Sequence, residues 1–136
     1  NIEIELTEMS MMDYNQEVLT KIKTLKKKGF TISIDDFGTG YSSLSYLKEF
    51  PVDTLKIDRS FIVNMNEGEP GVAMVAAIIS LAHALKLNVV AEGVETDYEL
   101  NILKNHNCEF VQGYYFSRPL SVDDFNKKVE SKQLTI

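Results

Sequence analysis

Residues 30–43 read FTISIDDFGTGYSS, the most informative stretch of the chain. In its first six positions apolar and polar side chains alternate, which is the period-two pattern of a strand with one buried face. The pattern predicts a strand over residues 30–35. Asp35 and Asp36 then stand at the carboxyl end of that strand, where a glycine-rich turn begins.

Two adjacent aspartates supply hard oxygen ligands, which suit Mg²⁺ or Mn²⁺ rather than zinc or copper and favour phosphate chemistry. Gly38 and Gly40, on either side of Thr39, permit backbone angles that are closed to other residues. We therefore expect a loop that closes over a ligand and reopens. The stretch alone also fits a simple turn whose aspartates cap a helix.

The rest of the chain repeats the order of strand, polar loop and amphipathic helix. Strand patterns occupy residues 2–7, 30–35, 53–58, 88–92 and 109–113. Helical patterns occupy the stretch from Asp13 or Asn15 to Gly29, and residues 43–49, 71–86, 97–105 and 122–131. Residues 66–71, NEGEPG, are predicted to form a loop of low order. This alternation predicts an α/β protein with parallel strands covered by helices.

An open doubly wound sheet and a barrel both fit that order. Five polar residues stand at or near the carboxyl ends of different predicted strands: Glu5, Asp35, Lys56, Glu92 and Gln112. In a TIM-type barrel these strand ends meet on one face, where active sites are built. We therefore predict a partial (β/α) TIM-type barrel of about five βα units.

A complete barrel of this type needs roughly 250 residues and eight βα units, whereas this chain has 136 residues. A partial barrel leaves two sheet edges and part of its apolar interior uncovered. We therefore expect a homodimer, or pairing with a missing part of the barrel. The chain begins with Asn1 and enters a strand pattern at once, which suggests an excerpt from a longer protein.

Composition excludes some classes of function. The net charge of −6 leaves no basic stripe for a DNA or RNA polymer, so a phosphate ligand would need a cation to screen it. The lysines within residues 21–28 are expected to form a solvated helix face. One cysteine, Cys108, permits no internal disulfide and indicates a cytoplasmic setting. The apolar run 72–85 is too short to span a membrane.

Five segments of the chain resemble the motifs of the EAL family of cyclic di-GMP phosphodiesterases. The segments are ELTE at 5–8, DDFGTGYSSL at 35–44, LKIDRSF at 55–61, VVAEGVET at 89–96 and QGYYFSRPL at 112–120. The resemblance covers essentially the whole chain, with the motifs in order. It implies that residues 1–136 are the C-terminal portion of an EAL domain, which cleaves a cyclic dinucleotide to its linear form.

The resemblance also implies roles for the strand-end residues. Glu5, Asp35 and Asp36 would bind divalent cations, Mg²⁺ or Mn²⁺ and two in a complete domain, with Glu92 as a further ligand or as the base. Two cations sharing a water lower its pKa and stabilise the entering and leaving oxygens. Glu92 or Asp35 would accept the proton. Lys56 would hold that water or offset charge on the phosphoryl oxygens.

Further residues receive supporting roles from the same resemblance. Glu8 would hold the glycine-rich loop of Gly38, Thr39 and Gly40 by accepting hydrogen bonds from it, or else be a carboxylate at a helix start. Glu95 would lie next to the direct ligands and hold them in place, although its pattern also fits a helix start capped by Thr96. Gln112 would bind a metal-bound water or a phosphate. Arg118 would pair with a guanine edge or with a carboxylate.

One departure concerns the EAL signature itself. Its glutamate, together with an asparagine ligand on an earlier strand, belongs upstream in the family and is absent from these 136 residues. The isolated chain is therefore expected to carry most of a site but not all of it, and to be inactive alone. An alternative is a catalytically silent cyclic di-GMP receptor or regulatory module. The intact Asp35, Asp36, Lys56 and Glu92 favour the enzyme. Sensory or GGDEF domains, and a membrane anchor, are possible elsewhere in the parent protein.

Overall fold

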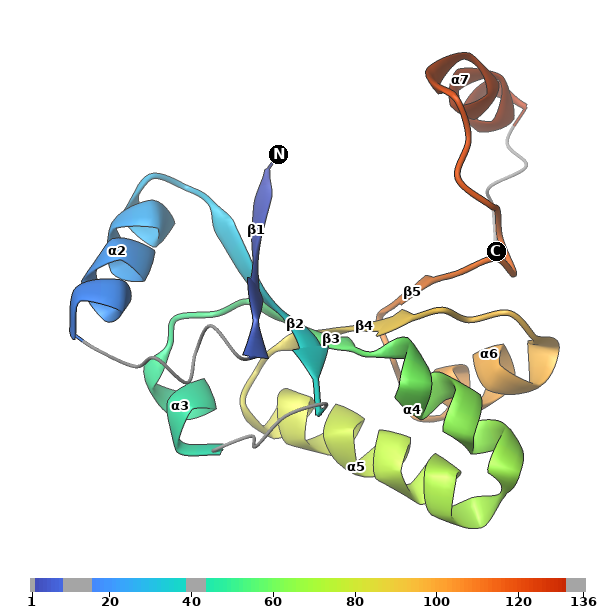
Figure 1. Ribbon diagram of the computed structural model, residues 1–136, viewed down its shortest axis with the longest axis horizontal. Helices are drawn as coiled ribbons and strands as arrows, with labels where there is room; N and C mark the ends of the chain where they lie inside the picture. The colour runs from blue at the N-terminus through green and yellow to red at the C-terminus, as the bar shows by residue number, and fades with distance from the viewer. Residues whose placement is uncertain (1, 9–15, 39–43, 132–136) are drawn as a thin grey trace.

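The computed structural model describes residues 2–8, 16–38 and 44–131. Its centre is a five-stranded sheet in which every neighbouring pair is parallel and the strand order follows the chain (Figure 1). The strands are β1 (Glu3–Thr7), β2 (Thr31–Phe37), β3 (Thr54–Ile57), β4 (Asn88–Glu92) and β5 (Phe110–Gln112). This confirms the predicted partial β/α architecture with parallel strands.

Helices connect successive strands as crossovers, and one further helix follows the last strand. They are α2 (Gln16–Lys27), α3 (Leu44–Glu49), α4 (Arg59–Asn64), the 3₁₀ turn η1 (Met65–Glu67), α5 (Glu69–Ala84), α6 (Asp97–Asn105) and α7 (Val122–Glu130). In Figure 1, α7 stands apart from the sheet, and it has no buried residue. None of the helices in the described part of the chain is long and apolar enough to cross a membrane.

The core lies between one face of the sheet and the helices. Ile32, Ile34, Leu55 and Ile57 are completely buried on that face, and Val75 of α5 is completely buried in the same cluster. Burying each such side chain contributes about 1.5–3 kcal/mol, which makes this face the main source of stability.

The opposite face of the sheet is polar. Glu5 pairs in register with Ser33, and Glu92 pairs with Gln112, so these side chains share that face with Lys56. Ser33 has no exposed surface, although its hydroxyl makes no hydrogen bond within the described structure. Strict alternation therefore places the core on one side and the predicted site residues on the other.

The prediction of a disordered loop at residues 66–71 is wrong. Residues 65–67 form η1, and α5 already begins at Glu69 with Pro70 in its first turn, a position that proline favours. A methyl group on Gly71 would meet the Asn64 carbonyl oxygen at 2.1 Å, so only glycine allows this close packing. Helix α4, begun by Asp58 accepting a hydrogen bond from Ser60 N at 3.0 Å, was also not predicted.

The expected solvated lysine face needs one correction. Lys26 is half-buried, and its Nζ lies 2.6 Å from Oδ2 of Asp53. That same oxygen accepts a hydrogen bond from Ile32 N at 2.8 Å. Lys26 therefore ties α2 to the amino end of the sheet, whereas Lys21 pairs with Glu17 at the exposed surface as predicted for a solvated face.

Candidate functional site

Lys56 is the centre of a cluster of carboxylates on the polar face of the sheet. Its Nζ lies 2.8 Å from Oε1 of Glu5, 3.0 Å from Oδ1 of Asp35 and 2.8 Å from Oε1 of Glu92. The four residues come from β3, β1, β2 and β4 respectively. The parallel register of these strands brings their carboxyl ends together, so residues up to 51 positions apart in the chain meet.

The cluster keeps Lys56 charged. Burial of this side chain would by itself lower the pKa, but the neighbouring carboxylates of Glu5, Glu92 and Asp35 outweigh burial and raise the pKa of Lys56 above its ordinary value. Oδ1 of Asp35 is buried and accepts no well-formed hydrogen bond, although it lies within ion-pair distance of Nζ. This oxygen therefore retains capacity for a further positively charged partner.

A β-bulge shapes the end of β2. The pairing of β2 with β3 shifts between Ile34 and Phe37, and Asp36 between them has a φ of 55°. Aspartate tolerates this left-handed region better than most residues. Asp35 still pairs in regular register with Thr7 of β1, so the bulge redirects the chain only after it, at Asp36. Both aspartates are half-buried.

Glu8 lies beside the start of the glycine-rich segment. Gly38 N donates a hydrogen bond of 2.9 Å to Oε2 of Glu8, and Glu8 is buried with 6% exposure. Gly38 itself has a φ of 96°, and a methyl group there would meet the Phe61 ring at 2.6 Å. The other predicted loop residues, Thr39 and Gly40, lie outside the described residues.

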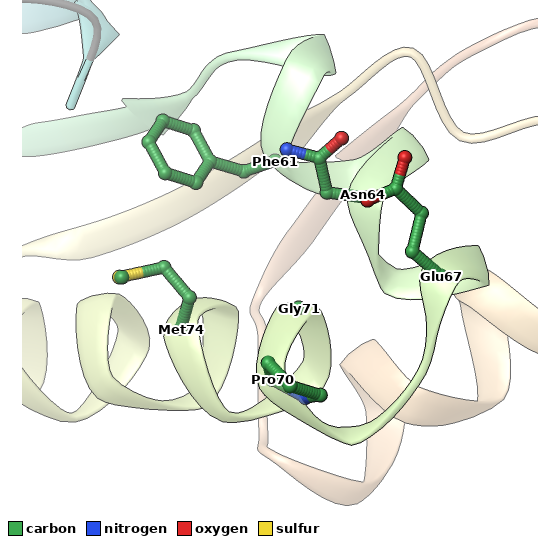
Figure 2. A pocket seen from close by; sticks show the side chains of 6 residues that line it. All are labelled: Phe61, Asn64, Glu67, Pro70, Gly71 and Met74. Carbon is green, nitrogen blue, oxygen red and sulfur yellow. The ribbon is translucent and has the colours of Figure 1, made fainter.

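Phe61 also lines a hollow that is distinct from its contact with Gly38. This hollow has a volume of about 330 Å³ and lies between α4, η1 and α5 (Figure 2). Met74, which is 53% exposed, lines it from α5. The hollow is separate from the Lys56 cluster, and Phe61 is the residue that links it to Gly38.

A second cavity adjoins the cluster at the ends of β4 and β5. It has a volume of about 320 Å³ and is lined by Arg59, Gly93, Glu95, Gln112, Gly113 and Tyr114. Arg59 Nη2 lies 2.8 Å from Oε1 of Glu95. Among the described contacts, Glu95 therefore pairs with Arg59 and not with Lys56. Arg59 was not among the site residues predicted from the sequence.

Arg118 and the tyrosines lie at the rim of this region. The guanidinium carbon of Arg118 is 4.8 Å from the centre of the Tyr114 ring, a cation–π geometry. Arg118, Gln112 and Tyr114 line a neighbouring cavity of about 290 Å³. Tyr115 donates a hydrogen bond to Asp97 Oδ1 at 2.6 Å, which holds the start of α6 to the end of β5.

The EAL domain family model matches residues 1–119. The chain belongs to the EAL domain family. It is 48% identical over 119 residues to the cyclic di-GMP phosphodiesterase NbdA of Pseudomonas aeruginosa. The matched region covers 88% of this chain and 15% of NbdA. The chain therefore spans a small part of the length of this relative.

Solved EAL structures have the same fold. The EAL enzyme Bd1971 in its cAMP and cyclic-di-GMP bound form matches with a TM-score of 0.90 and 42% identity, covering 95% of this chain and 34% of that one. The manganese and cyclic-di-GMP complex of Klebsiella pneumoniae BlrP1 matches with a TM-score of 0.78 and 36% identity, covering 86% of this chain and 30% of that one. Both neighbours are thus structures of nucleotide complexes, one of them with a divalent metal.

The carboxylate oxygens of this EAL chain are the type of ligand that a hard divalent cation binds. Three carboxylate oxygens, from Glu5, Asp35 and Glu92, already converge on one positive group. Carboxylates are ligands that Mg²⁺ and Mn²⁺ prefer. In residues 2–8, 16–38 and 44–131, however, no three His, Cys, Asp or Glu side chains are gathered closely enough to form a metal site. The Lys56 ammonium lies between the carboxylates of Glu5 and Asp35.

Sequence reasoning missed two features of the EAL site. Arg59 follows the β3 segment directly and lines the second cavity, and its position one residue beyond Asp58 at a strand end was the available signal. Ser33 is two residues before Asp35, and period two places it on the same face, buried beside the site. The spacing of two residues from Asp35 was the signal that could have identified Ser33 as a site residue.

Proposed function

We propose that this chain is the C-terminal portion of an EAL domain that hydrolyses cyclic di-GMP to the linear dinucleotide with Mg²⁺ or Mn²⁺. The observation that carries the proposal is the convergence of Glu5, Asp35 and Glu92 on Lys56 at the carboxyl ends of four strands. Membership of the EAL family and the nucleotide-bound relatives support the same reaction.

In this proposal Glu5, Asp35, Asp36 and Glu92 would hold two cations. When bound, divalent cations supply an activated water and neutralise charge at phosphorus. Glu92 or Asp35 accepts the proton of the attacking water, because each carboxylate contacts Lys56 within the cluster. Lys56, kept charged by the surrounding carboxylates, offsets negative charge on the phosphoryl oxygens.

The remaining predicted residues support the substrate. Glu8 holds the entrance of the glycine-rich segment through Gly38 N. Gln112 pairs in register with Glu92 on β4, so its amide is available to a phosphate or a metal-bound water beside the reacting centre. Arg118 lies over the Tyr114 ring at the rim, where its guanidinium would pair with a guanine edge or with a carboxylate.

The proposal extends to partners and setting. The chain covers 15% of NbdA, so sensory or GGDEF domains are expected in a longer parent protein. The single cysteine and acidic charge fit a cytoplasmic domain. The open edges of β1 and β5 are expected to pair with a further part of the barrel or with a second copy.

The test is chromatographic detection of linear dinucleotide after the purified chain, and in parallel the full-length protein that contains it, is incubated with cyclic di-GMP and Mn²⁺ or Mg²⁺. In the full-length protein we expect turnover that Asp35→Asn abolishes and that Lys56→Met lowers on the order of 10²–10³-fold, since a preorganised positive donor is removed. Lys48→Met, on the exposed surface of α3, is the matched control and should leave turnover unchanged.

Two results would change the assignment. Turnover that survives in both Asp35→Asn and Lys56→Met would exclude this cluster as the reacting centre. Binding of cyclic di-GMP without turnover, in the chain and also in the full-length protein, would favour the alternative of a catalytically silent receptor. Activity only in the full-length protein would indicate that upstream ligands complete the site.

A further inference from the structure

The cavity beside the Lys56 cluster contains an ion pair for which the proposed chemistry has no use. Arg59 and Glu95 line it with Gln112, and Glu95 is three residues beyond Glu92. We propose that Arg59 and Glu95 together read the edge of one guanine of the cyclic dinucleotide and make the site select guanine over adenine. This inference rests on the proposed function and names the residues that set its base specificity.

Two glycines form a rigid floor for this cavity. A methyl group on Gly93 would meet Cγ of Arg59 at 2.2 Å, so the arginine stem packs directly on the backbone there. A methyl group on Gly113 would meet the Val94 carbonyl oxygen at 2.0 Å. The N–H of Val94 donates a hydrogen bond of 3.1 Å to the Gln112 carbonyl oxygen, and the Val94 carbonyl oxygen accepts one of 3.0 Å from Tyr115 N. The stem of Arg59 therefore packs directly against the backbone at Gly93.

The polar ends of the pair remain accessible to a ligand. The side chains of Arg59 and Glu95 are 60% and 41% exposed, and the described contact joins only Nη2 to Oε1. A guanidinium has five N–H donors, so others are left for a ligand. An ion pair this exposed adds little to the stability of the fold, so stabilisation alone is a weak explanation for its presence.

The chemistry of the pair matches guanine. Guanine presents two acceptors, O6 and N7, which arginine binds as a fork, and its neighbouring N–H groups suit a carboxylate. Adenine presents an amino donor in place of O6, and that donor would face the guanidinium donors. A phosphate fits less well than a base edge, because the Glu95 carboxylate would repel it.

The position of the cavity agrees with this assignment. Gln112 belongs both to the cavity lining and to the register pair with Glu92, so a base in the cavity lies next to the reacting centre. Tyr114, which is 53% exposed, lines the same cavity and offers an aromatic face to the base.

The test compares kcat/KM for cyclic di-GMP and cyclic di-AMP in the full-length protein with Mn²⁺. Arg59→Met keeps the stem on Gly93 and removes the fork. We expect it to lower kcat/KM for cyclic di-GMP on the order of 10- to 100-fold and to leave that for cyclic di-AMP unchanged. Lys21→Met, which breaks the exposed pair of Lys21 with Glu17 on α2, is the matched control and should change neither value.

The double variant Arg59→Glu with Glu95→Arg separates base reading from a structural role. It restores an ion pair but reverses donor and acceptor, so we expect the preference for guanine to stay lost. Restoration of the wild-type preference in the double variant, or its full retention in Arg59→Met, would overturn the inference and leave the proposed function standing. A wild-type protein that cleaves neither nucleotide would overturn both.

Discussion

Gly38 carries two constraints at one position. Its φ of 96° lies in the region that side chains rarely adopt, and the space where a Cβ would stand is occupied by the Phe61 ring. Its N–H meanwhile donates to Glu8. The residue thereby lets β2, α4 and the segment after β1 approach one another at the entrance to the cluster.

Gly29 offers a matched control for Gly38. It has a φ of 88°, but nothing lies within 4 Å of the place for its Cβ. We expect Gly29→Ala to lower the free energy of unfolding by about 1–2 kcal/mol through backbone strain alone. Gly38→Ala should cost more than Gly29→Ala, since steric overlap with Phe61 is added to similar strain. Chemical denaturation of both variants measures the difference, and equal losses would contradict a tight contact with Phe61.

Helix α6 illustrates how one side chain both starts an element and attaches it. Thr96 Oγ1 accepts a hydrogen bond from Glu99 N at 3.2 Å, and Glu99 Oε2 accepts one from Thr96 N at 3.0 Å, which is a capping box. Glu99 Oε1 also accepts a hydrogen bond of 2.8 Å from Asn66 of η1. The sequence predicted Thr96 as a cap, while the attachment to η1 depends on the folded chain.

We expect Glu99→Ala to lower the free energy of unfolding by about 1–3 kcal/mol, because the backbone donors of the helix start and Asn66 lose a buried acceptor. Glu130→Ala, at the exposed end of α7, should have little effect. Thermal or urea unfolding measures both. A loss in Glu99→Ala no larger than in Glu130→Ala would contradict the role of this carboxylate.

The same residue predicts a pH dependence. Burial would raise the pKa of Glu99, but hydrogen bonds from Glu95 N, Asn66 and Thr96 outweigh it and lower the pKa below 4.5. The carboxylate therefore stabilises the fold above pH 4.5, and this contribution is lost as the pH falls through the lowered pKa. The stability difference between wild type and Glu99→Ala should accordingly shrink in acid.

On the scale of the whole molecule, the described sheet has two open edges. Within the described strands β1 pairs with β2 alone and β5 pairs with β4 alone. Phe110 on β5 is 55% exposed, and Val122 and Phe125 on α7 are 76% and 51% exposed. Open edges together with exposed apolar side chains favour association with another chain or segment.

We therefore expect the purified chain to associate with itself, with a melting temperature that rises with protein concentration. Phe110→Lys places a charge on the open edge and should shift the chain toward the monomer, whereas Tyr98→Lys on exposed α6 should not. Size-exclusion chromatography with light scattering measures both variants. A wild-type chain that stays monomeric at every concentration would contradict the expected association.

The five strands and the helices that connect them could be predicted from the sequence, because the periodicity of apolar residues is a local property. The sequence also placed carboxylates and Lys56 at strand ends. It did not predict α4 or η1, because six residues of α4 are too few to show a helical period. The bulge at Asp36 was equally hidden, since its backbone angle depends on pairing with β3.

The contacts between these residues depend on the folded chain. Glu5 and Lys56 are 51 positions apart, and no local pattern specifies that their side chains form an ion pair. The same holds for Arg59 with Glu95, which depends on the close packing of the arginine stem against Gly93. Strand register sets such contacts, and register results from the packing of the whole sheet and its helices rather than from any one segment.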